Sequence, residues 1–220
     1  IEENISTCME IPLNSKLSDK LQSITETTLG HYNGRATEFW NGTKDHDVSQ
    51  NIDALLNSIA GSAPYTILDF GCGPGRDVLN FKKLNHNPTG LDGCENFANM
   101  AREHSGCEVL HQNFLELDLP KEHFDGIFAN ASLFHIPKSE FGRVLKELVN
   151  TLKVGGVLFS SNPRGTAEGW NGNRWAYYME LEEYQLYLEE AGLILEDHYY
   201  RPAGLPREQQ PWLACIARKK

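Results

Sequence analysis

From about residue 65 to the C-terminus, short apolar runs alternate with amphipathic stretches, and this alternation constrains the fold more than any other feature. The apolar runs predict strands at 65–70, 88–92, 107–111, 124–130, 155–161, 193–200 and 212–218. The stretches between them have helical spacing and predict helices at 76–84, 95–104, 138–152 and 181–191. Strands that alternate with helices form a mostly parallel sheet covered on both faces, so we predict an α/β fold.

The connection between the last two predicted strands differs from the others. Its sequence, RPAGLPREQQP at 201–211, contains three prolines and one glycine and fits no helix. A hairpin-like return therefore makes the final strand antiparallel. Five parallel strands followed by such a closing pair form the Rossmann-like, seven-stranded sheet of class I methyltransferases, which is the architecture that we expect.

Residues 1–64 have a different pattern. The stretches at 17–32 and 48–61 have helical apolar spacing, and a polar segment lies between them. We predict that residues 30–64 form a helical lid on a cofactor-binding core at 65–220, and that both belong to one methyltransferase domain. Residues 1–29 are expected to be an N-terminal extension or a linker.

Composition narrows the class of protein. The 220 residues include 20 basic and 30 acidic ones, and the net charge of −10 opposes binding to nucleic acids or anionic membranes, which favours a small-molecule partner. No apolar run approaches the roughly 20 residues that span a bilayer, and no signal peptide is evident, so we expect a cytoplasmic protein. The five cysteines include no C-x-x-C pair, so we expect reduced thiols and no metal site.

The strongest local signal is ILDFGCGPGRD at 67–77, directly after the first predicted strand. Glycines here let the backbone turn sharply and approach a ligand, although such a loop is also consistent with a tight turn alone. The dinucleotide fingerprint would need glycine where Arg76 stands, and Asp69 would repel a pyrophosphate. A cationic amino-acid tail suits Asp69 better. The loop therefore resembles that of S-adenosylmethionine enzymes, with Asp69 near the ligand ammonium.

Two further features follow the next strands in order. Asp92 ends the second strand, where a carboxylate can accept from both ribose hydroxyls or cap a helix. Asn113 and Phe114 follow the third strand and suit the adenine, although Phe114 alone would suit the core. We therefore expect a cofactor site formed by Tyr32, Trp40, Asp69, Gly71, Cys72, Gly73, Arg76, Asp92, Gly93, Asn113, Phe114, Asn130 and Ala131.

The fourth predicted strand ends in ANASLFHI, which places Asn130, Ala131, Ser132 and His135 at the methyl-donor end of this site. His135 has apolar neighbours, which favours a packed or capping histidine over a base. The segment carries neither the D/N-P-P-Y/F/W motif of amino-methylating DNA enzymes nor the Pro-Cys nucleophile of cytosine methylation. This again disfavours a nucleic-acid substrate.

Polar and aromatic residues gather in the lid and after the fifth and sixth strands. His46, Asp47 and Asn130 are the candidate catalytic residues, with capping of the following helix as the alternative for Asp47. An arginine fork can hold a substrate carboxylate, although most surface arginines are simply solvated. The candidate substrate-binding residues are Asn162, Arg164, Arg174 and Arg207.

Several segments together carry a more specific resemblance. DHDVSQN, SSNPRG, EGWNGNRW and RPAGLPREQQPW resemble the methyltransferase domain of ovothiol-biosynthesis enzymes, from about residue 30 to the end. The resemblance implies methyl transfer from S-adenosylmethionine to the imidazole Nπ of 5-thiohistidine, which yields ovothiol A. It also implies fusion to, or action with, a 5-histidylcysteine sulfoxide synthase, and the start at Ile1 suits a piece of such a fusion.

The chemistry of this reaction sets simple requirements. Methyl transfer from a sulfonium is an in-line displacement, so the protein mainly positions donor and acceptor. Control of the imidazole tautomer needs a group that accepts the Nτ hydrogen, and Asp47, Asn130 and His46 are all candidates. The rival hypotheses are a methyltransferase for another small acceptor and a nonenzymatic cofactor-binding domain that regulates a fused enzyme.

Overall fold

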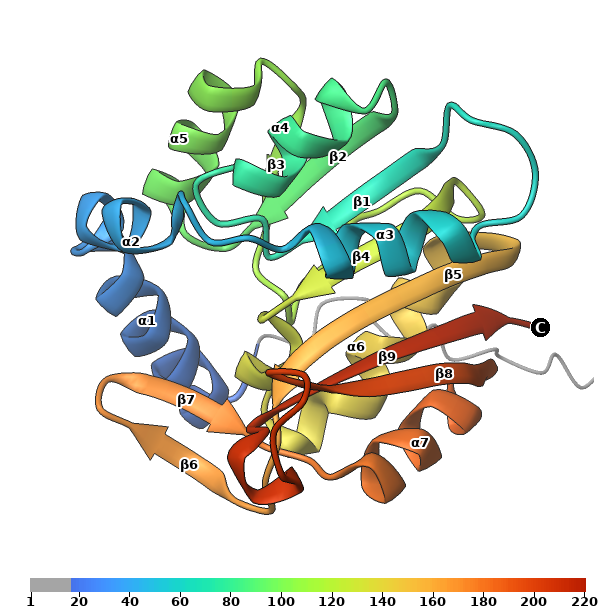
Figure 1. Ribbon diagram of the computed structural model, residues 1–220. Coiled ribbons are helices and arrows are strands. Elements are labelled where there is room, and N and C mark those ends of the chain that lie inside the picture. Colours follow the sequence, from blue (N-terminus) through green and yellow to red (C-terminus); the bar gives the residue numbers. More distant parts are fainter. Residues whose placement is uncertain (1–16) are drawn as a thin grey trace, which may run out of the picture.

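The computed structural model describes residues 17–220 and contains a seven-stranded sheet in the order β3-β2-β1-β4-β5-β9-β8 (Figure 1). Its strands are β1 (Thr66–Phe70), β2 (Asn87–Asp92), β3 (Val109–His111), β4 (Phe124–Asn130), β5 (Leu152–Pro163), β8 (Leu193–Arg201) and β9 (Trp212–Lys219). Neighbouring strands from β3 to β5 are parallel, whereas β9 is antiparallel to both β5 and β8. The predicted sheet is confirmed, including its antiparallel last strand.

Helices cover both faces of this sheet. One face carries α3 (Ser49–Ser58), α4 (Arg76–Lys83) and α5 (Glu95–Ser105), and the other carries α6 (Lys138–Thr151) and α7 (Leu181–Glu190). The helices begin and end within a few residues of their predicted bounds, apart from the earlier end of α3. None of the helices described between residues 17 and 220 has the length and hydropathy of a membrane-spanning segment.

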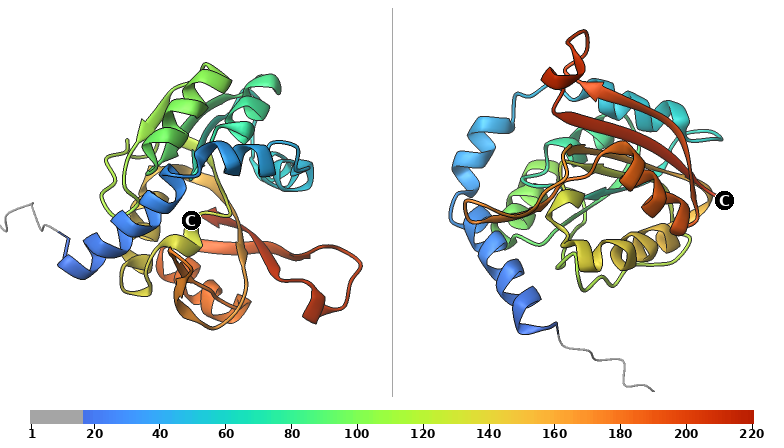
Figure 2. Two further views of the ribbon diagram at one scale, coloured as in Figure 1. Left: turned by 90° about the vertical axis from the view of Figure 1, so that its left-hand side faces the viewer. Right: turned by 90° about the horizontal axis from the view of Figure 1, so that it is seen from below.

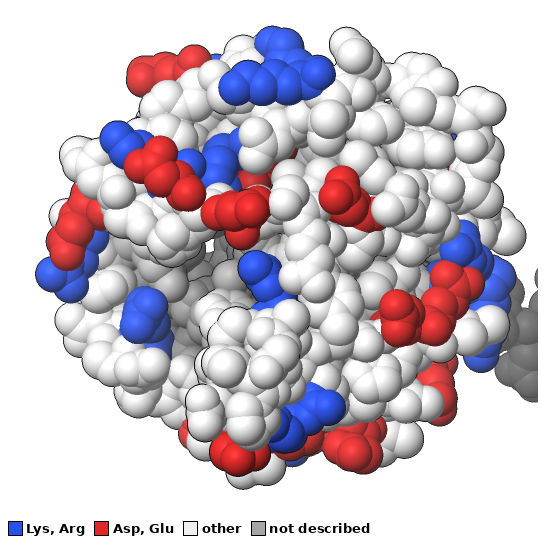
Figure 3. Space-filling model, in the orientation of Figure 1, with Lys and Arg blue, Asp and Glu red and all other residues white. Residues whose placement is uncertain are grey.

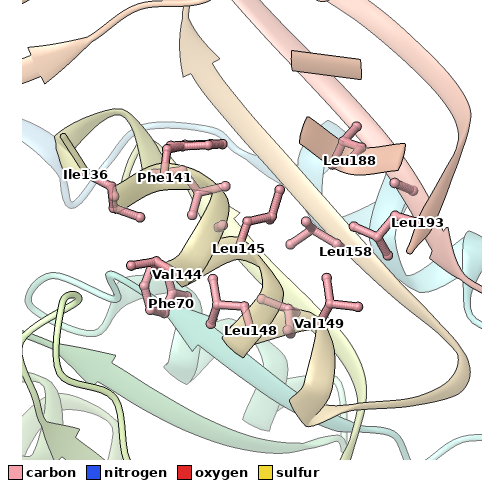
Figure 4. Close-up of a cluster of buried hydrophobic side chains, with 14 of the residues drawn as sticks. Phe70, Ile136, Phe141, Val144, Leu145, Leu148, Val149, Leu158, Leu188 and Leu193 are labelled. Carbon is pink, nitrogen blue, oxygen red and sulfur yellow. The ribbon is translucent and has the colours of Figure 1, made fainter. Parts of the chain in front are cut away.

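The core follows from the alternation of side chains along each strand. Ile67 packs with Leu55 of α3, whereas its neighbours Leu68 and Phe70 pack with α6 on the opposite face. Figure 4 shows the larger cluster, in which Phe70 and residues of α6 meet Leu158 of β5. Because the parallel strands are packed on both faces, their free carboxyl ends and the following loops are left to form a site.

The N-terminal region is helical, but it contains one helix more than predicted. Helix α1 (Asp19–Asn33) begins after Ser18, whose Oγ accepts a hydrogen bond from the backbone N–H of Leu21 at 3.4 Å. Helix α2 (Ala36–Thr43) occupies the polar segment for which no helix was predicted. The predicted boundary between residues 29 and 30 falls inside α1, and residues 1–16 lie outside the described part of the chain.

A two-stranded hairpin, β6 (Glu168–Asn171) and β7 (Arg174–Tyr177), was also not predicted. It occupies the glycine-rich stretch after β5, and its turn contains Gly172 at a φ of +59°. Helix α1 lies beside β7, where the backbone N–H of Trp175 donates to Thr28 Oγ1 at 3.0 Å (Figures 1 and 2). Figure 2 also shows the β8–β9 connection projecting from the body of the molecule.

Candidate functional site

A pocket of about 710 Å³ lies at the carboxyl ends of the parallel strands, between the sheet and the helices α1 and α2. Its walls come from these helices, from the loops after β1, β2, β3 and β4, from β7 and from the β8–β9 connection. Figure 3 shows the surface hollowed beside α1 and α2, with charged side chains of both signs around the rim. The strand ends therefore form one side of the pocket, and the N-terminal helices, β7 and the β8–β9 connection form the other.

The glycine loop after β1 forms one wall of this pocket. Gly71 has a φ of +77°, and a Cβ there would lie 2.3 Å from Ser132 Cβ, so only glycine fits. Gly75 has a φ of +92°, and a Cβ there would lie 2.6 Å from Ala101 Cα in α5. In contrast, the nearest atom to a Cβ at Gly73 is a ring carbon of Phe39 at 3.6 Å. Gly71 and Gly75 thus serve the protein's own packing, and Gly73 leaves its backbone accessible to a ligand.

Asp92 connects the end of β2 to the glycine loop. Its Oδ2 accepts from the Gly73 backbone N–H and its Oδ1 from the Cys94 backbone N–H, both at 2.8 Å. The side chain is only 7% exposed, and this burial raises the pKa of Asp92 to about 6, although the two amides favour the ionised form. Each carboxylate oxygen can accept another hydrogen bond, so Asp92 presents acceptors to the pocket.

Asp69 lies inside the protein and not on the pocket wall. Its Oδ2 is buried and has no hydrogen-bond partner among residues 17–220. Burial, followed by the nearby Asp77 charge, raises the pKa of Asp69 well above its usual range. We expected Asp69 to lie beside a ligand ammonium, but in this structure Asp69 does not reach the pocket. Asp77 does line the pocket.

Arg76 fastens the lid to the core. Its Nε and Nη2 donate to the two carboxylate oxygens of Asp77 at 2.8 Å each, and its Nη1 donates to the Thr43 carbonyl at 2.9 Å. The Trp40 ring stacks on His104 of α5, with ring centroids 4.3 Å apart. Arg76 and Trp40 both line the pocket and both hold α2 in place.

The predicted adenine residues follow β3 and line the pocket. Phe114 stacks on Phe70, with ring centroids 4.2 Å apart, and so joins the pocket to the core. The Asn113 amide is used locally, because its Oδ1 accepts from the Leu115 backbone N–H at 3.0 Å and its Nδ2 donates to Glu116 at 3.2 Å. Phe114 thus offers a ring face, whereas Asn113 shapes the turn.

The end of β4 carries a buried amide network. Asn51 of α3 is fully buried, and its Nδ2 donates to Asn130 Oδ1 at 2.9 Å. The Tyr199 hydroxyl donates to Asn51 Oδ1 at 2.8 Å. Asn130 lines the pocket beside Ala131, which adopts a φ of +63°. Asn51 takes one lone pair of the Asn130 oxygen, so Asn130 can still offer the second lone pair and its amide nitrogen to a ligand.

The remaining catalytic candidates lie on the rim of the pocket. Asp47 Oδ1 accepts from the Ser49 backbone N–H at 2.9 Å, and this bond lowers the pKa of Asp47 below its usual value. The capping alternative for Asp47 is therefore realised, and its other carboxylate oxygen stays available. His46 is exposed on the same rim.

The structure separates the predicted arginines into two groups. Asn162, Arg164 and Arg207 are not among the residues that line the pocket. Arg164 pairs with Glu180 at 2.9 Å and donates to the Arg207 carbonyl, while Asn162 Oδ1 accepts from the Phe134 backbone N–H at 3.3 Å. These side chains support the C-terminal loops. Arg174 does line the pocket, and Arg201 joins it there.

Sequence reasoning assigned no site role to several residues of the pocket wall. Thr28, Phe39, Asp77 and Phe97 line it, as does His135, for which a packing role had been favoured. The aromatic rings lie on amphipathic helices, where their spacing indicates only burial. Arg201 ends β8, and its polar segment had indicated an arginine that could hold a carboxylate, although Arg207 of the same segment was selected as the candidate.

Comparisons with known proteins find similarity to methyltransferases. The family model described as a methyltransferase domain matches residues 67–156, which run from β1 to the first part of β5 and contain the glycine loop. This segment is similar to a methyltransferase domain. An uncharacterised methyltransferase of Geobacillus sp. (strain WCH70) is 31% identical over 111 residues, covering 50% of this chain and 52% of that protein. The chain thus spans about half the length of this relative.

Other known methyltransferases share parts of the chain or its fold. The sterol 24-C-methyltransferase of Clavispora lusitaniae (strain ATCC 42720) is 29% identical over 100 residues, covering 42% of this chain and 26% of that protein. The 1,6-didemethyltoxoflavin-N1-methyltransferase of Burkholderia thailandensis superposes with a TM-score of 0.72 at 21% identity, covering 95% of this chain and 94% of that chain. Its structure contains S-adenosylhomocysteine. The last similarity establishes the fold alone.

The pocket fits the predicted cofactor, S-adenosylmethionine, which the match to the methyltransferase-domain model and the S-adenosylhomocysteine in the similar Burkholderia structure confirm. Asp92 offers two carboxylate oxygens for the ribose hydroxyls, and Phe114 offers a ring face for the adenine. Gly73 leaves the loop backbone open on the same wall. When bound, S-adenosylmethionine supplies a methyl group on a sulfonium, and these residues would hold its nucleoside part.

Proposed function

We propose that this protein transfers a methyl group from S-adenosylmethionine to the imidazole Nπ of 5-thiohistidine and thereby forms ovothiol A. The proposal depends on one observation: the segments that carry the ovothiol resemblance converge on one pocket although they are far apart in sequence. DHDVSQN contributes His46 and Asp47, EGWNGNRW contributes Arg174, and RPAGLPREQQPW contributes Arg201. A small-molecule substrate is proposed accordingly, as is action with a 5-histidylcysteine sulfoxide synthase.

The charges in this part of the pocket suit an amino acid. Arg174 and Arg201 line it, and neither forms an ion pair with a carboxylate of the described chain. A free amino acid would place its carboxylate at these guanidinium groups and its ammonium at Asp47, whose pKa is held low. An in-line displacement then needs the ring nitrogen to be oriented toward the methyl group.

A solved relative supports nitrogen as the acceptor atom. The Burkholderia thailandensis protein is an N1-methyltransferase, and its structure contains the small molecule 1,6-didemethyltoxoflavin. The same fold thus accommodates methylation of a nitrogen in a small molecule. Because the identity is only 21%, this similarity supports the type of reaction and not the identity of the acceptor. The acceptor is proposed from the residues of this pocket.

The test is an assay of the purified protein with S-adenosylmethionine and either 5-thiohistidine or histidine, with product identification by NMR. We expect methylation of 5-thiohistidine on Nπ, and Arg201→Gln should raise KM for 5-thiohistidine about tenfold through loss of a charged hydrogen bond. Arg207→Gln is the matched control, because Arg207 lies outside the pocket. Methylation on sulfur, faster methylation of another acceptor, or S-adenosylhomocysteine binding without turnover would each contradict the proposal.

A further inference from the structure

A chain of hydrogen bonds on the pocket wall fixes the tautomer of His135. The His135 Nδ1 lies 2.7 Å from the Trp175 carbonyl oxygen, which can only accept, so Nδ1 carries the hydrogen. Burial lowers the pKa of His135 to about 4, with the nearby Arg174 charge acting in the same direction. The ring is therefore neutral near pH 7, and its Nε2 has a free lone pair.

This tautomer in turn fixes the direction of the Tyr32 hydroxyl. Tyr32 Oη lies 2.8 Å from His135 Nε2, and because Nε2 can only accept, the hydroxyl must donate. The Tyr32 oxygen then has lone pairs but no hydrogen to offer to the pocket that it lines. Toward the pocket, the Tyr32 oxygen therefore acts only as a hydrogen-bond acceptor.

The surrounding contacts hold this pair in place. Trp175, which anchors His135, donates its own N–H to Thr28, one helical turn before Tyr32 in α1. The Tyr32 ring packs against Phe39 and Phe97, with centroids 5.7 and 5.6 Å away. These contacts therefore fix the position of the Tyr32 oxygen, in addition to its role as a hydrogen-bond acceptor.

The same pair is poorly suited to remove a proton. Burial raises the pKa of Tyr32, a hydrogen bond from the Arg174 guanidinium and its charge oppose this rise, and Asp92 and Tyr178 add to it. The Tyr32 oxygen keeps a second lone pair for a ligand. His31 and Arg174 both disfavour a positive charge on His135. A neutral phenol hydrogen-bonded to a weakly basic imidazole can orient an N–H group and leaves the proton where it is.

We propose that the Tyr32 oxygen accepts the Nτ–H of the substrate imidazole and so directs the lone pair of Nπ toward the methyl group, with His135 as the positioning residue. This inference rests on the proposed function and deepens it. In the reaction, the Nπ lone pair forms the new N–C bond, the bond from methyl carbon to sulfonium sulfur breaks, and its electron pair stays on that sulfur. A substrate that enters as the thiolate becomes a methylimidazolium ring that keeps its Nτ hydrogen and still carries the thiolate, so these charges cancel and no proton has to leave.

The direction of the hydrogen bond between Tyr32 and His135 can be tested without cofactor or substrate. In ¹⁵N NMR of the histidine-labelled protein at pH 7, His135 should be neutral with hydrogen on Nδ1, and Tyr32→Phe should shift its Nε2 resonance. A hydrogen on Nε2, or a charged ring, would overturn the inference whatever the protein methylates. This measurement therefore separates failure of the inference from failure of the proposed function.

The role toward substrate is tested by three variants. Tyr32→Phe should lower kcat for 5-thiohistidine about tenfold or more, as expected for one lost hydrogen bond, and should yield products methylated elsewhere than Nπ. Tyr32 had been expected in the cofactor site, but the proposal assigns its oxygen to the substrate. Affinity for S-adenosylhomocysteine should therefore change less than about twofold in calorimetry, which is less than the loss of one hydrogen bond would cause. Tyr184→Phe is the matched control, because its hydroxyl bonds Ser160 away from the pocket.

His135→Phe should reproduce the kcat loss of Tyr32→Phe, and the double variant should be no slower than either single one, because His135 acts only through Tyr32. Additive losses, or full retention of Nπ selectivity in Tyr32→Phe, would overturn the inference. If the wild type methylates another nitrogen compound, the proposed function fails, and the same variants assayed on that compound decide the role of Tyr32.

Discussion

The binding of S-adenosylhomocysteine should weaken sharply below pH 6 because of Asp92. The ribose hydroxyls need the ionised carboxylate as acceptor, and the folded pKa of Asp92 is about 6. At pH 5 a group with this pKa is ionised in about one molecule in eleven, so affinity should fall about tenfold relative to pH 7.5, or about 1.4 kcal/mol. His135, with a pKa of about 4, stays neutral over this range.

The stability of the ligand-free protein should respond to the same group in the opposite sense. The pKa of Asp92 rises from 3.8 to about 6 on folding, so between these values the folded state binds more protons than the unfolded state. The free energy of unfolding should therefore fall as pH rises through this window, by about 3 kcal/mol from this group. Acid thus strengthens the contribution of Asp92 to the ligand-free fold while it weakens ligand binding. His135 contributes with the opposite sign, because its pKa falls from 6.5 to about 4 on folding, so the Asp92 effect is measured as the difference between wild type and a variant at this position.

Isothermal titration calorimetry and urea unfolding of wild type and Asp92→Asn test both effects. The variant should bind S-adenosylhomocysteine weakly at every pH, with no drop between pH 7.5 and 5. From pH 4 to 6, the wild type should lose about 2 kcal/mol of unfolding free energy relative to the variant. The slopes decide the outcome, because the asparagine amide also disturbs the two backbone hydrogen bonds. Equal affinity of the wild type at both pH values, or an unchanged slope in the variant, would refute the assignment.

Two further predictions concern the loop and the lid. Gly71→Ala and Gly155→Ala introduce the same strain of about 1–2 kcal/mol at a φ of +77°, but only Gly71→Ala also clashes with Ser132, so thermal unfolding should show an additional loss of about 1–3 kcal/mol. Equal melting temperatures would contradict this. Arg76→Gln should accelerate hydrogen exchange in α2, whereas Arg143→Gln, which breaks surface pairs on α6, should not. Unchanged exchange in α2 would show that Arg76 does not hold the lid.

The sequence predicted the sheet and the backbone positions at its edge because both follow from local patterns. A strand of period 2 followed by a glycine turn determines where Gly71 and Asp92 lie, whatever the rest of the chain does. The sequence did not predict the direction of each side chain. Asp69 and Arg76 belong to one motif, yet Asp69 lies inside the protein and Arg76 on the pocket wall.

The contacts at the substrate end were beyond sequence reasoning because they join distant segments. Tyr32 meets His135 across 103 positions, and Thr28 meets Trp175 across 147. Arg164 and Arg201 occur in similar polar segments, and only the packing of the loops determines that Arg201 lines the pocket. Helix α2 was missed for a related reason, since Arg76 and His104 of the core hold it in place.

The two halves of the pocket also differ in what similarity to other proteins can reveal. The family match at residues 67–156 contains the glycine loop and Asp92, the expected cofactor residues, and it also contains Asn130 and His135 on the pocket wall. Asp47, Arg174 and Arg201 lie outside that match, on segments fastened to the sheet by individual side-chain contacts. Those segments can change without disturbing the strand ends that hold the cofactor. Distant methyltransferases can therefore match this protein at the strand ends and differ in acceptor, so the acceptor proposed here is inferred from the lid, the β6–β7 hairpin and the β8–β9 connection.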